Sequence, residues 1–175
     1  TPTGSWSVVL KERQFQRANI TLPQSFLDNK VPELAQQEKL PAAGAIETFQ
    51  LINSKLRAEN EKRIRELSSQ DDSEKHWKGA FRQLNNSKVT SVFAERGSYF
   101  VDGNQISEAT HFGYDLAATA NTPVTASNAG RVSFAGLLGI YGNCVLVDHG
   151  MGITSLYAHL SRIDVKQGDM VAMGQ

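Results

Sequence analysis

The chain has 175 residues, of which 40% are hydrophobic and 21% are charged, which predicts one ordinary globular core plus an appended region. Eighteen basic residues balance eighteen acidic ones, so the composition argues against a nucleic-acid partner and against a general attraction to polyanions. No stretch approaches the ~18 consecutive apolar residues of a membrane span, and no signal peptide opens the sequence. The single cysteine, Cys144, lies in an apolar run and is predicted to be a buried structural thiol.

The first forty residues predict a β-rich start followed by turns. Residues 5–20 alternate loosely between apolar and polar side chains, which is typical of one or two strands. Three prolines between residues 23 and 41 interrupt the chain and leave room only for a short helix near Ser25–Gln37. We therefore assign residues 1–40 to the remnant of an upstream β module plus a linker.

The next segment predicts an amphipathic helix over Ala45–Leu67. Its apolar residues recur at three- and four-residue intervals or multiples of them, while Glu59–Arg63 and Glu61–Arg65 have the spacing of i,i+4 ion pairs on the polar side. We expect this helix to pack on the core with its charged face in solvent; a partner-binding or autoinhibitory helix is the alternative. Residues 41–85 thus form a helical connecting region.

From residue 86 onward the pattern is almost entirely β. Asp102-Gly103 stands between two alternating segments, a strong signal for a hairpin. Further strands are predicted, with glycines at many of the turns, at residues 123–126, 131–134, 143–148, 152–158 and 170–172. Short, closely spaced strands of this kind fit a small antiparallel barrel or sandwich. The predicted class is therefore α+β, with a helical or irregular N-terminal region followed by a mainly antiparallel β domain over residues 86–175.

The first candidate site is the segment His111-Phe112-Gly113-Tyr114-Asp115. In an extended backbone, alternation places His111, Gly113 and Asp115 on one face. Imidazole and carboxylate are both ordinary zinc ligands, and the intervening glycine adds no side chain to crowd an ion. A surface strand or a simple polar pair is the alternative interpretation of the same residues.

Seven short motifs occur in the order found in the lysostaphin-type or LytM-like zinc metallopeptidases. They are His111–Ala117, Thr122–Ala126, Gly130–Val132, Tyr141–Asn143, Val147–Gly150, Tyr157–Ser161 and Val165–Val171. The sequence resembles this family from about residue 89 to residue 175. Within the family, Tyr99–Gly103 and Leu138–Asn143 are similar to the envelope peptidases of Gram-negative bacteria.

The resemblance implies a zinc endopeptidase that cuts the peptide part of peptidoglycan in the periplasm or cell envelope. His111 and Asp115 stand where family members carry zinc ligands, and His159 stands where they carry a catalytic histidine. On a strand over Ile153–Ser161, His159 would project from the polar face, where a neutral imidazole can accept or orient a proton of the attacking water. His149, which lies between two strands beside glycines, is predicted to stabilise a turn instead.

The resemblance also exposes an absence. Family members complete the zinc site with a His-x-His pair on a later strand, and the four histidines here, His76, His111, His149 and His159, include no such pair. Because hydrolytic zinc generally has three protein ligands plus a water, we expect a C-terminally incomplete, inactive domain with open sheet edges. The resemblance further implies an export signal or membrane anchor upstream, and a regulatory envelope protein as a partner.

Two functions of other classes remain open. Degenerate members of the same family activate separate cell-wall amidases without hydrolysing anything, but they usually lose zinc residues that this sequence keeps. Gly130–Val132 and Val165–Val171 also resemble the biotinyl or lipoyl carrier domains. A carrier needs a lysine at an exposed hairpin tip, and the turn between Val147 and Ile153 contains none.

Overall fold

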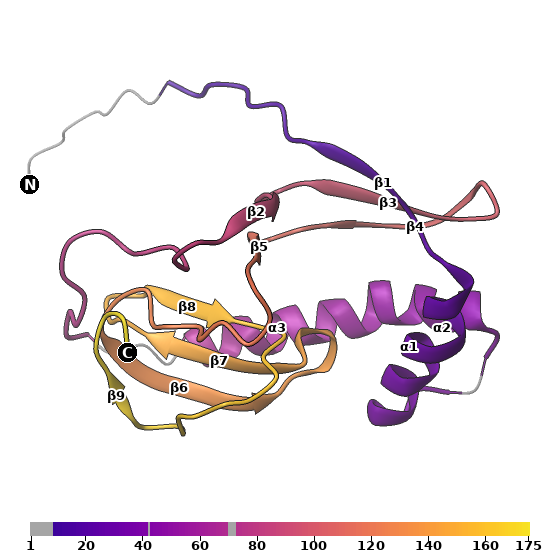
Figure 1. Cartoon of the computed structure of the whole chain (residues 1–175). Helices are drawn as coiled ribbons and strands as arrows, with labels where there is room; N and C mark the ends of the chain where they lie inside the picture. Colours follow the sequence, from indigo (N-terminus) through magenta and orange to yellow (C-terminus); the bar gives the residue numbers. More distant parts are fainter. Residues whose placement is uncertain (1–8, 42, 70–72) are drawn as a thin grey trace, which may run out of the picture.

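The structure is a computed structural model that describes residues 9–41, 43–69 and 73–175. A long helical run extends behind a four-stranded sheet, and a second, three-stranded sheet lies above the other end of that run (Figure 1). Helices and mainly antiparallel sheets confirm the predicted α+β class. No helix in the described ranges is long and apolar enough to cross a membrane.

The N-terminal part contains one strand and one helix. Strand β1 (Arg17–Thr21) is the described remainder of the predicted β segment, because residues 9–16 have no regular secondary structure and residues 5–8 lie outside the described ranges. Helix α1 (Gln24–Gln37) confirms the predicted short helix, and Leu27 and Val31, one turn apart, are its buried residues.

The predicted amphipathic helix is present as one continuous run. It consists of α2 (Ala45–Leu51), a π-helical segment η1 (Ile52–Leu56) and α3 (Arg57–Ser68). Phe49, Ile52 and Leu56 are buried in one core cluster together with residues of α1 and the three-stranded sheet. The apolar periodicity therefore identified the buried face, although it gave no sign of the wider π-helical turn.

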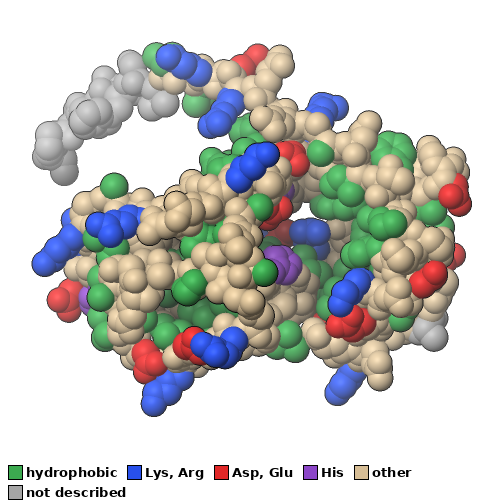
Figure 2. Space-filling view, viewed as in Figure 1, with side chains coloured by type: hydrophobic (Ala, Val, Ile, Leu, Met, Phe, Trp, Pro, Cys, Tyr) green, Lys and Arg blue, Asp and Glu red, His purple; other side chains and the backbone are tan. Residues whose placement is uncertain are grey.

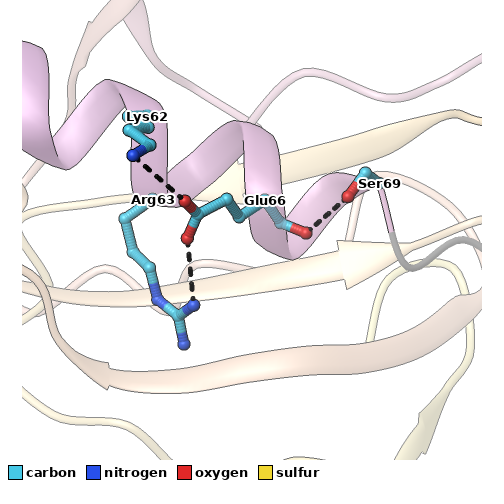
Figure 3. Close-up of polar contacts among 4 residues, drawn as sticks. All are labelled: Lys62, Arg63, Glu66 and Ser69. Atoms are coloured by element: carbon cyan, nitrogen blue, oxygen red, sulfur yellow. Dashed lines mark hydrogen bonds and ion pairs between the residues drawn. The ribbon is translucent and has the colours of Figure 1, made fainter.

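The ion pairs on this helix differ from those predicted. In the described part of α3, Glu66 rather than Glu59 or Glu61 pairs with basic side chains, at 3.9 Å from Lys62 and 3.3 Å from Arg63 (Figure 3). The Ser69 hydroxyl donates to the Glu66 carbonyl at 2.8 Å. All of these side chains are solvent-exposed, and exposed pairs of this kind contribute little to stability.

Eight strands follow the helices, with bounds β2 (Lys88–Ser91), β3 (Arg96–Val101), β4 (Asn104–Thr110), β5 (Asp115–Ala117), β6 (Gly130–Leu137), β7 (Asn143–Asp148), β8 (Thr154–Tyr157) and β9 (Met170–Val171). They form three sheets, β1-β3-β4, β2-β5 and β8-β7-β6-β9, rather than one closed barrel. Only β1 and β3 pair in parallel; the other described pairs are antiparallel. The β1–β3 pairing also joins residues that the sequence assigned to separate regions, 1–40 and 86–175.

The predicted strand signals were confirmed unevenly. The β3–β4 hairpin turns at Asp102 and Gly103, whose φ angles of 48° and 78° are those of a type I′ turn. Residues 123–126 are not a strand; Ala126 instead exchanges backbone hydrogen bonds with Gly174 and Gln175. The expected open edges are present, since β4 and β8 each end a sheet within the described residues.

Alternation along β7 divides its side chains between two faces of the sheet. Val145 and Val147 pack in one cluster, whereas Cys144 and Leu146 are fully buried on the other side against Leu67 of α3. Burial raises the pKa of the Cys144 thiol to about 11. The thiol is therefore protonated near neutral pH, which agrees with a structural role and excludes it as a nucleophile.

His149 also has the structural role that was predicted for it. It is completely buried at the end of β7, where Nδ1 lies 2.7 Å from the Ala129 carbonyl and Nε2 lies 2.8 Å from the Ser155 hydroxyl. Its backbone N–H donates to the Ile153 carbonyl across the turn. Both ring nitrogens are thus satisfied within the protein, and neither is free to bind a metal.

Gly130, at the start of β6, is expected to be intolerant of any side chain. A Cβ there would contact the Asp148 carbonyl and lie 2.7 Å from Cγ1 of Val147. Gly130→Ala should therefore lower the free energy of unfolding by about 1–3 kcal/mol, measured by urea denaturation. Gly136→Ala in the same strand is the control, because its nearest neighbour, in the Phe134 ring, is 3.4 Å away. Equal losses in both variants would contradict this packing.

Candidate metal centre

His111 and Asp115 occupy the two ends of a bend rather than one strand. β4 ends at Thr110 and β5 begins at Asp115, so the continuous extended segment predicted from the sequence is wrong. The bend nevertheless brings the two side chains together, with Nε2 of His111 3.3 Å from Oδ1 of Asp115. The expected convergence is therefore present, although a turn and not strand alternation produces it.

The backbone of His111 is fixed by the loop that precedes β3. Its N–H donates to the Glu95 carbonyl at 2.9 Å, and its carbonyl accepts the Ala94 N–H at 2.7 Å. These bonds continue the β3–β4 pairing by two residues beyond the regular ladder. The histidine is thereby held at the rim of the sheet, at the point where the chain turns away.

A short polar chain determines which ring nitrogen of His111 carries the proton. Nδ1 lies 2.9 Å from Oγ of Ser91, and that oxygen lies 3.1 Å from Oε1 of Glu95. An ionised carboxylate only accepts hydrogen bonds, so the Ser91 hydroxyl donates to Glu95 and accepts the Nδ1–H of His111. In the neutral imidazole this leaves the lone pair of Nε2 facing a carboxylate oxygen of Asp115.

Two acceptors cannot face each other at 3.3 Å without a positive group between or on them. Either Nε2 carries a proton and donates it to Asp115, or a cation binds both atoms. In a tetrahedral zinc site with ligand bonds of about 2.0–2.1 Å, two ligand atoms are about 3.3–3.4 Å apart, which matches the separation observed between His111 and Asp115. The donor set and its spacing therefore fit zinc.

The pair is open to further ligands. The His111 and Asp115 side chains are 31% and 61% exposed, so other groups can reach both donor atoms. Among the described residues, no third His, Cys, Asp or Glu joins them in a cluster that could hold a metal. The described residues thus provide two of the three protein ligands that a hydrolytic zinc site generally has.

His159 lies outside the strand that was expected to carry it. β8 ends at Tyr157, and His159 has a left-handed φ of 56°. Ser155 and Tyr157 do share a face, since both approach the Ser127 hydroxyl, at 3.2 and 2.8 Å. His159 does not extend that row, so the predicted strand over Ile153–Ser161 is wrong beyond residue 157 and alternation does not place this side chain.

The loop that precedes β7 positions the backbone of His159. Its N–H donates to the Tyr141 carbonyl at 2.9 Å. Tyr141 belongs to the 3₁₀ turn η2 (Gly139–Tyr141), and the Ile140 N–H in that turn donates to Oδ1 of the buried Asn60 at 2.9 Å. Helix α3 therefore fixes the turn, and the turn fixes the exposed His159.

Sequence reasoning missed the residues that support the two halves of the site, which are the His111–Asp115 pair and the segment that carries His159. Asn60 could have been noticed, because it stands in the apolar stripe of the helix, four residues after Leu56 and four before Ile64. An amide at such a position needs a hydrogen-bond partner in the core. Ser91 and Glu95 gave no comparable signal, since their relation to His111 depends on the loop before β3.

One cleft is lined by all three predicted site residues, His111, Asp115 and His159. The exposed aromatic residues Phe112 and Tyr114 lie along the same cleft. Figure 2 shows this face of the molecule hollowed near its centre, with a histidine side chain at the margin of the hollow. The arrangement joins a metal-type pair, an imidazole and apolar contact surface in one open groove.

Comparisons with known proteins agree with this geometry. The profile of Peptidase family M23 matches residues 109–175. Over 60 residues the chain is 47% identical to the DD-carboxypeptidase/endopeptidase Mpg of Neisseria meningitidis, and this match covers 34% of this chain and 14% of Mpg. Over 67 residues it is 40% identical to the peptidoglycan DD-endopeptidase ShyA of Vibrio cholerae, covering 38% of this chain and 16% of ShyA.

A solved structure supports the same assignment. A Pseudomonas aeruginosa protein assigned to peptidase M23 superposes with a TM-score of 0.50 and 29% sequence identity, over 65% of this chain and 44% of that one. The chain thus spans less than half of that structure and about one-sixth or less of the curated relatives. Residues 109–175 match peptidase family M23, which agrees with the resemblance to LytM-like peptidases predicted from the sequence motifs.

Proposed function

We propose that this chain is part of a zinc metalloendopeptidase that cuts peptide bonds of peptidoglycan in the cell envelope. The observation that carries the proposal is the 3.3 Å approach of His111 Nε2 to Asp115 Oδ1 in an open cleft. The names of two relatives, a DD-carboxypeptidase/endopeptidase and a peptidoglycan DD-endopeptidase, support peptidoglycan as the substrate. The periplasm follows as the location, since peptidoglycan lies there in Gram-negative bacteria.

The residues of this chain divide the chemistry between them. His111 and Asp115 would hold the metal, and a residue outside the described part of the chain would complete its ligands, because no third ligand stands beside them there. Bound zinc would supply a Lewis acid that polarises the scissile carbonyl and acidifies the attacking water. His159 would accept or orient a proton of that water. With only two ligands, the 175-residue chain by itself should bind zinc weakly and be inactive.

The full-length protein, purified with zinc, provides the test. It should release products from crosslinked peptidoglycan peptides, lose that activity when a chelator removes zinc, and regain it when zinc is restored. Undiminished cleavage by the zinc-free protein would overturn the metal assignment. Absence of cleavage together with stimulation of a cell-wall amidase would favour the alternative function, a non-catalytic amidase activator.

Ser91 is expected to set the metal affinity through His111. Ser91→Ala removes the oxygen that accepts the Nδ1–H of His111, so the tautomer with a free Nε2 is no longer enforced. Loss of such an outer hydrogen bond typically weakens metal binding 10- to 100-fold, which a zinc competition titration on the full-length protein would measure. Ser54→Ala is the matched control, because that exposed hydroxyl bonds only to the Gln50 carbonyl within the helix. Unchanged affinity in Ser91→Ala would contradict the role of the polar chain.

A further inference from the structure

The helical run lies alongside β4 and runs in the same direction. The Gln50 side-chain amide donates to the Ile106 carbonyl at 2.8 Å. One turn later, Nδ2 of Asn53 lies 2.8 Å from the Ser107 hydroxyl and 3.4 Å from the Glu108 carbonyl. Successive turns of the helix therefore meet successive residues of the strand.

The same alignment places Arg57 close to the end of β4. Arg57 follows Asn53 by four residues, about one turn further along the helical run, and so lies nearer the end of β4. Two residues beyond Glu108 is Thr110, the last residue of β4 and the neighbour of His111. Arg57, His111 and Asp115 line the same cleft.

Arg57 also lies in the same cleft as Tyr141 and His159. Burial raises the pKa of Tyr141, and Glu61 adds to the rise, whereas the positive charge of Arg57 opposes it. The Arg57 charge is therefore close enough to act on Tyr141, whose carbonyl accepts the N–H of His159. Arg57 thus stands on the helix between the two halves of the site.

Asn53 holds the guanidinium in one orientation. Nε and Nη2 of Arg57 both donate to Oδ1 of Asn53, at 3.2 and 2.8 Å. Asn53 is itself buried and is anchored to β4 by its own amide. These bonds use the side edge of the guanidinium, so the terminal edge, formed by the remaining N–H groups of Nη1 and Nη2, keeps its donors.

The guanidinium of Arg57 is not ion-paired in the part of the chain that the structure describes. A half-buried cation that is already oriented, with two parallel donors unused, matches the geometry of a carboxylate. Asp115 does not serve this purpose, since its carboxylate pairs with His111.

We propose that Arg57 is a substrate-binding residue whose terminal guanidinium edge binds a carboxylate of the peptide substrate. This contact would place the neighbouring peptide bond between the His111–Asp115 pair and His159. The inference rests on the proposed peptidase function and adds that the substrate is recognised as an anionic peptide. Asn53 acts through Arg57 as a positioning residue.

Peptide binding tests this inference separately from catalysis. A stem peptide released from peptidoglycan, and the same peptide with its carboxylates converted to amides, would be titrated into zinc-free full-length protein. A charge-assisted hydrogen-bonded pair should make the acidic peptide bind about 10- to 100-fold more tightly than its amide. Arg57→Gln should bind both peptides equally, whereas the exposed control Arg63→Gln, paired with Glu66 in the native chain, should discriminate like the native protein.

The variants would also be assayed for cleavage after zinc is restored, and for thermal unfolding. Arg57→Gln should lower kcat/KM on the acidic peptide by the same factor and leave the amidated peptide unaffected. Three results would overturn the inference. The first is discrimination that survives in Arg57→Gln, and the second is no discrimination by the native protein. The third is equal losses on both peptides, which would show a structural role. Failure of the native protein to cleave, with discrimination in binding intact, would count against the peptidase proposal alone.

Discussion

Asp115→Ala in the full-length protein is expected to remove zinc and peptide cleavage together. Asp115 contributes one of the two donor atoms that this chain brings to within 3.3 Å of each other, and alanine offers no replacement. A site reduced to His111 and one further ligand would have too few protein ligands for hydrolytic zinc. Metal analysis after dialysis should find no bound zinc, and cleavage of peptidoglycan peptides should fall to background.

Asp164→Ala is the matched control for this substitution. Asp164 is also an exposed carboxylate with a basic partner, Arg162, at 2.7 Å. Its loss should affect stability by no more than about 1 kcal/mol and leave zinc content unchanged. Were Asp115 merely the acidic half of a surface ion pair with His111, the two variants would behave alike. Stoichiometric zinc in Asp115→Ala would therefore exclude it as a ligand.

His159→Ala is expected to have a different outcome, in which zinc stays bound and cleavage slows. His159 belongs to no cluster with His111 and Asp115 that could hold a metal, yet it lines the same cleft. A general acid or base typically contributes about 10²- to 10⁴-fold to the rate, so kcat should fall by about 10²-fold or more. Zinc content and single-turnover cleavage, measured on the same preparation, separate the two effects.

His76→Ala provides the control for the loss of an imidazole. The backbone N–H of His76 donates to the carbonyl of His149, which follows the last residue of β7. His159 lies at the other end of this strand, because the N–H of its neighbour Leu160 donates to the carbonyl of Asn143, the first residue of β7. The two histidines are therefore separated by the length of a six-residue strand, about 17–20 Å. His76→Ala should cleave normally. Loss of zinc from His159→Ala, or unchanged cleavage, would show that His159 has another role.

Local sequence patterns predicted the elements whose structure depends on local forces. The helix over Ala45–Leu67 followed from apolar periodicity, which reports burial of one face. The β3–β4 hairpin followed from Asp102-Gly103, because few other residue pairs accept two left-handed φ angles in succession. Cys144 and His149 were also placed correctly, since an apolar run and a glycine-flanked turn each constrain the surroundings of one residue.

The arrangement of the site depended on contacts between residues far apart in sequence. Alternation predicted that His111 and Asp115 converge, but the chain bends after His111, the last residue whose backbone still pairs with Glu95 and Ala94. His159 was assigned to a strand that ends two residues earlier; in the structure it has a left-handed φ, and its N–H donates to the Tyr141 carbonyl. Such hydrogen bonds leave no periodic trace in the sequence.

The parallel pairing of β1 with β3 was missed for the same reason. Their first register pair joins Arg17 to Arg96, 79 positions later in the sequence, with the entire helical region between them. Neither strand carries a signal that names its partner. A strand near residue 20 was predicted from alternation, yet its membership in the sheet that leads to His111 became apparent only in the structure.

The most direct test of the proposed metal centre is diffraction from crystals of the full-length, zinc-loaded protein at the zinc absorption edge. One anomalous peak should lie about 2.0–2.2 Å from both Nε2 of His111 and a carboxylate oxygen of Asp115, with Nδ1 of His111 still bonded to Ser91. A peak at other residues, or a His111–Asp115 pair without metal in a protein that still cleaves peptidoglycan peptides, would contradict the assignment of these two residues as zinc ligands.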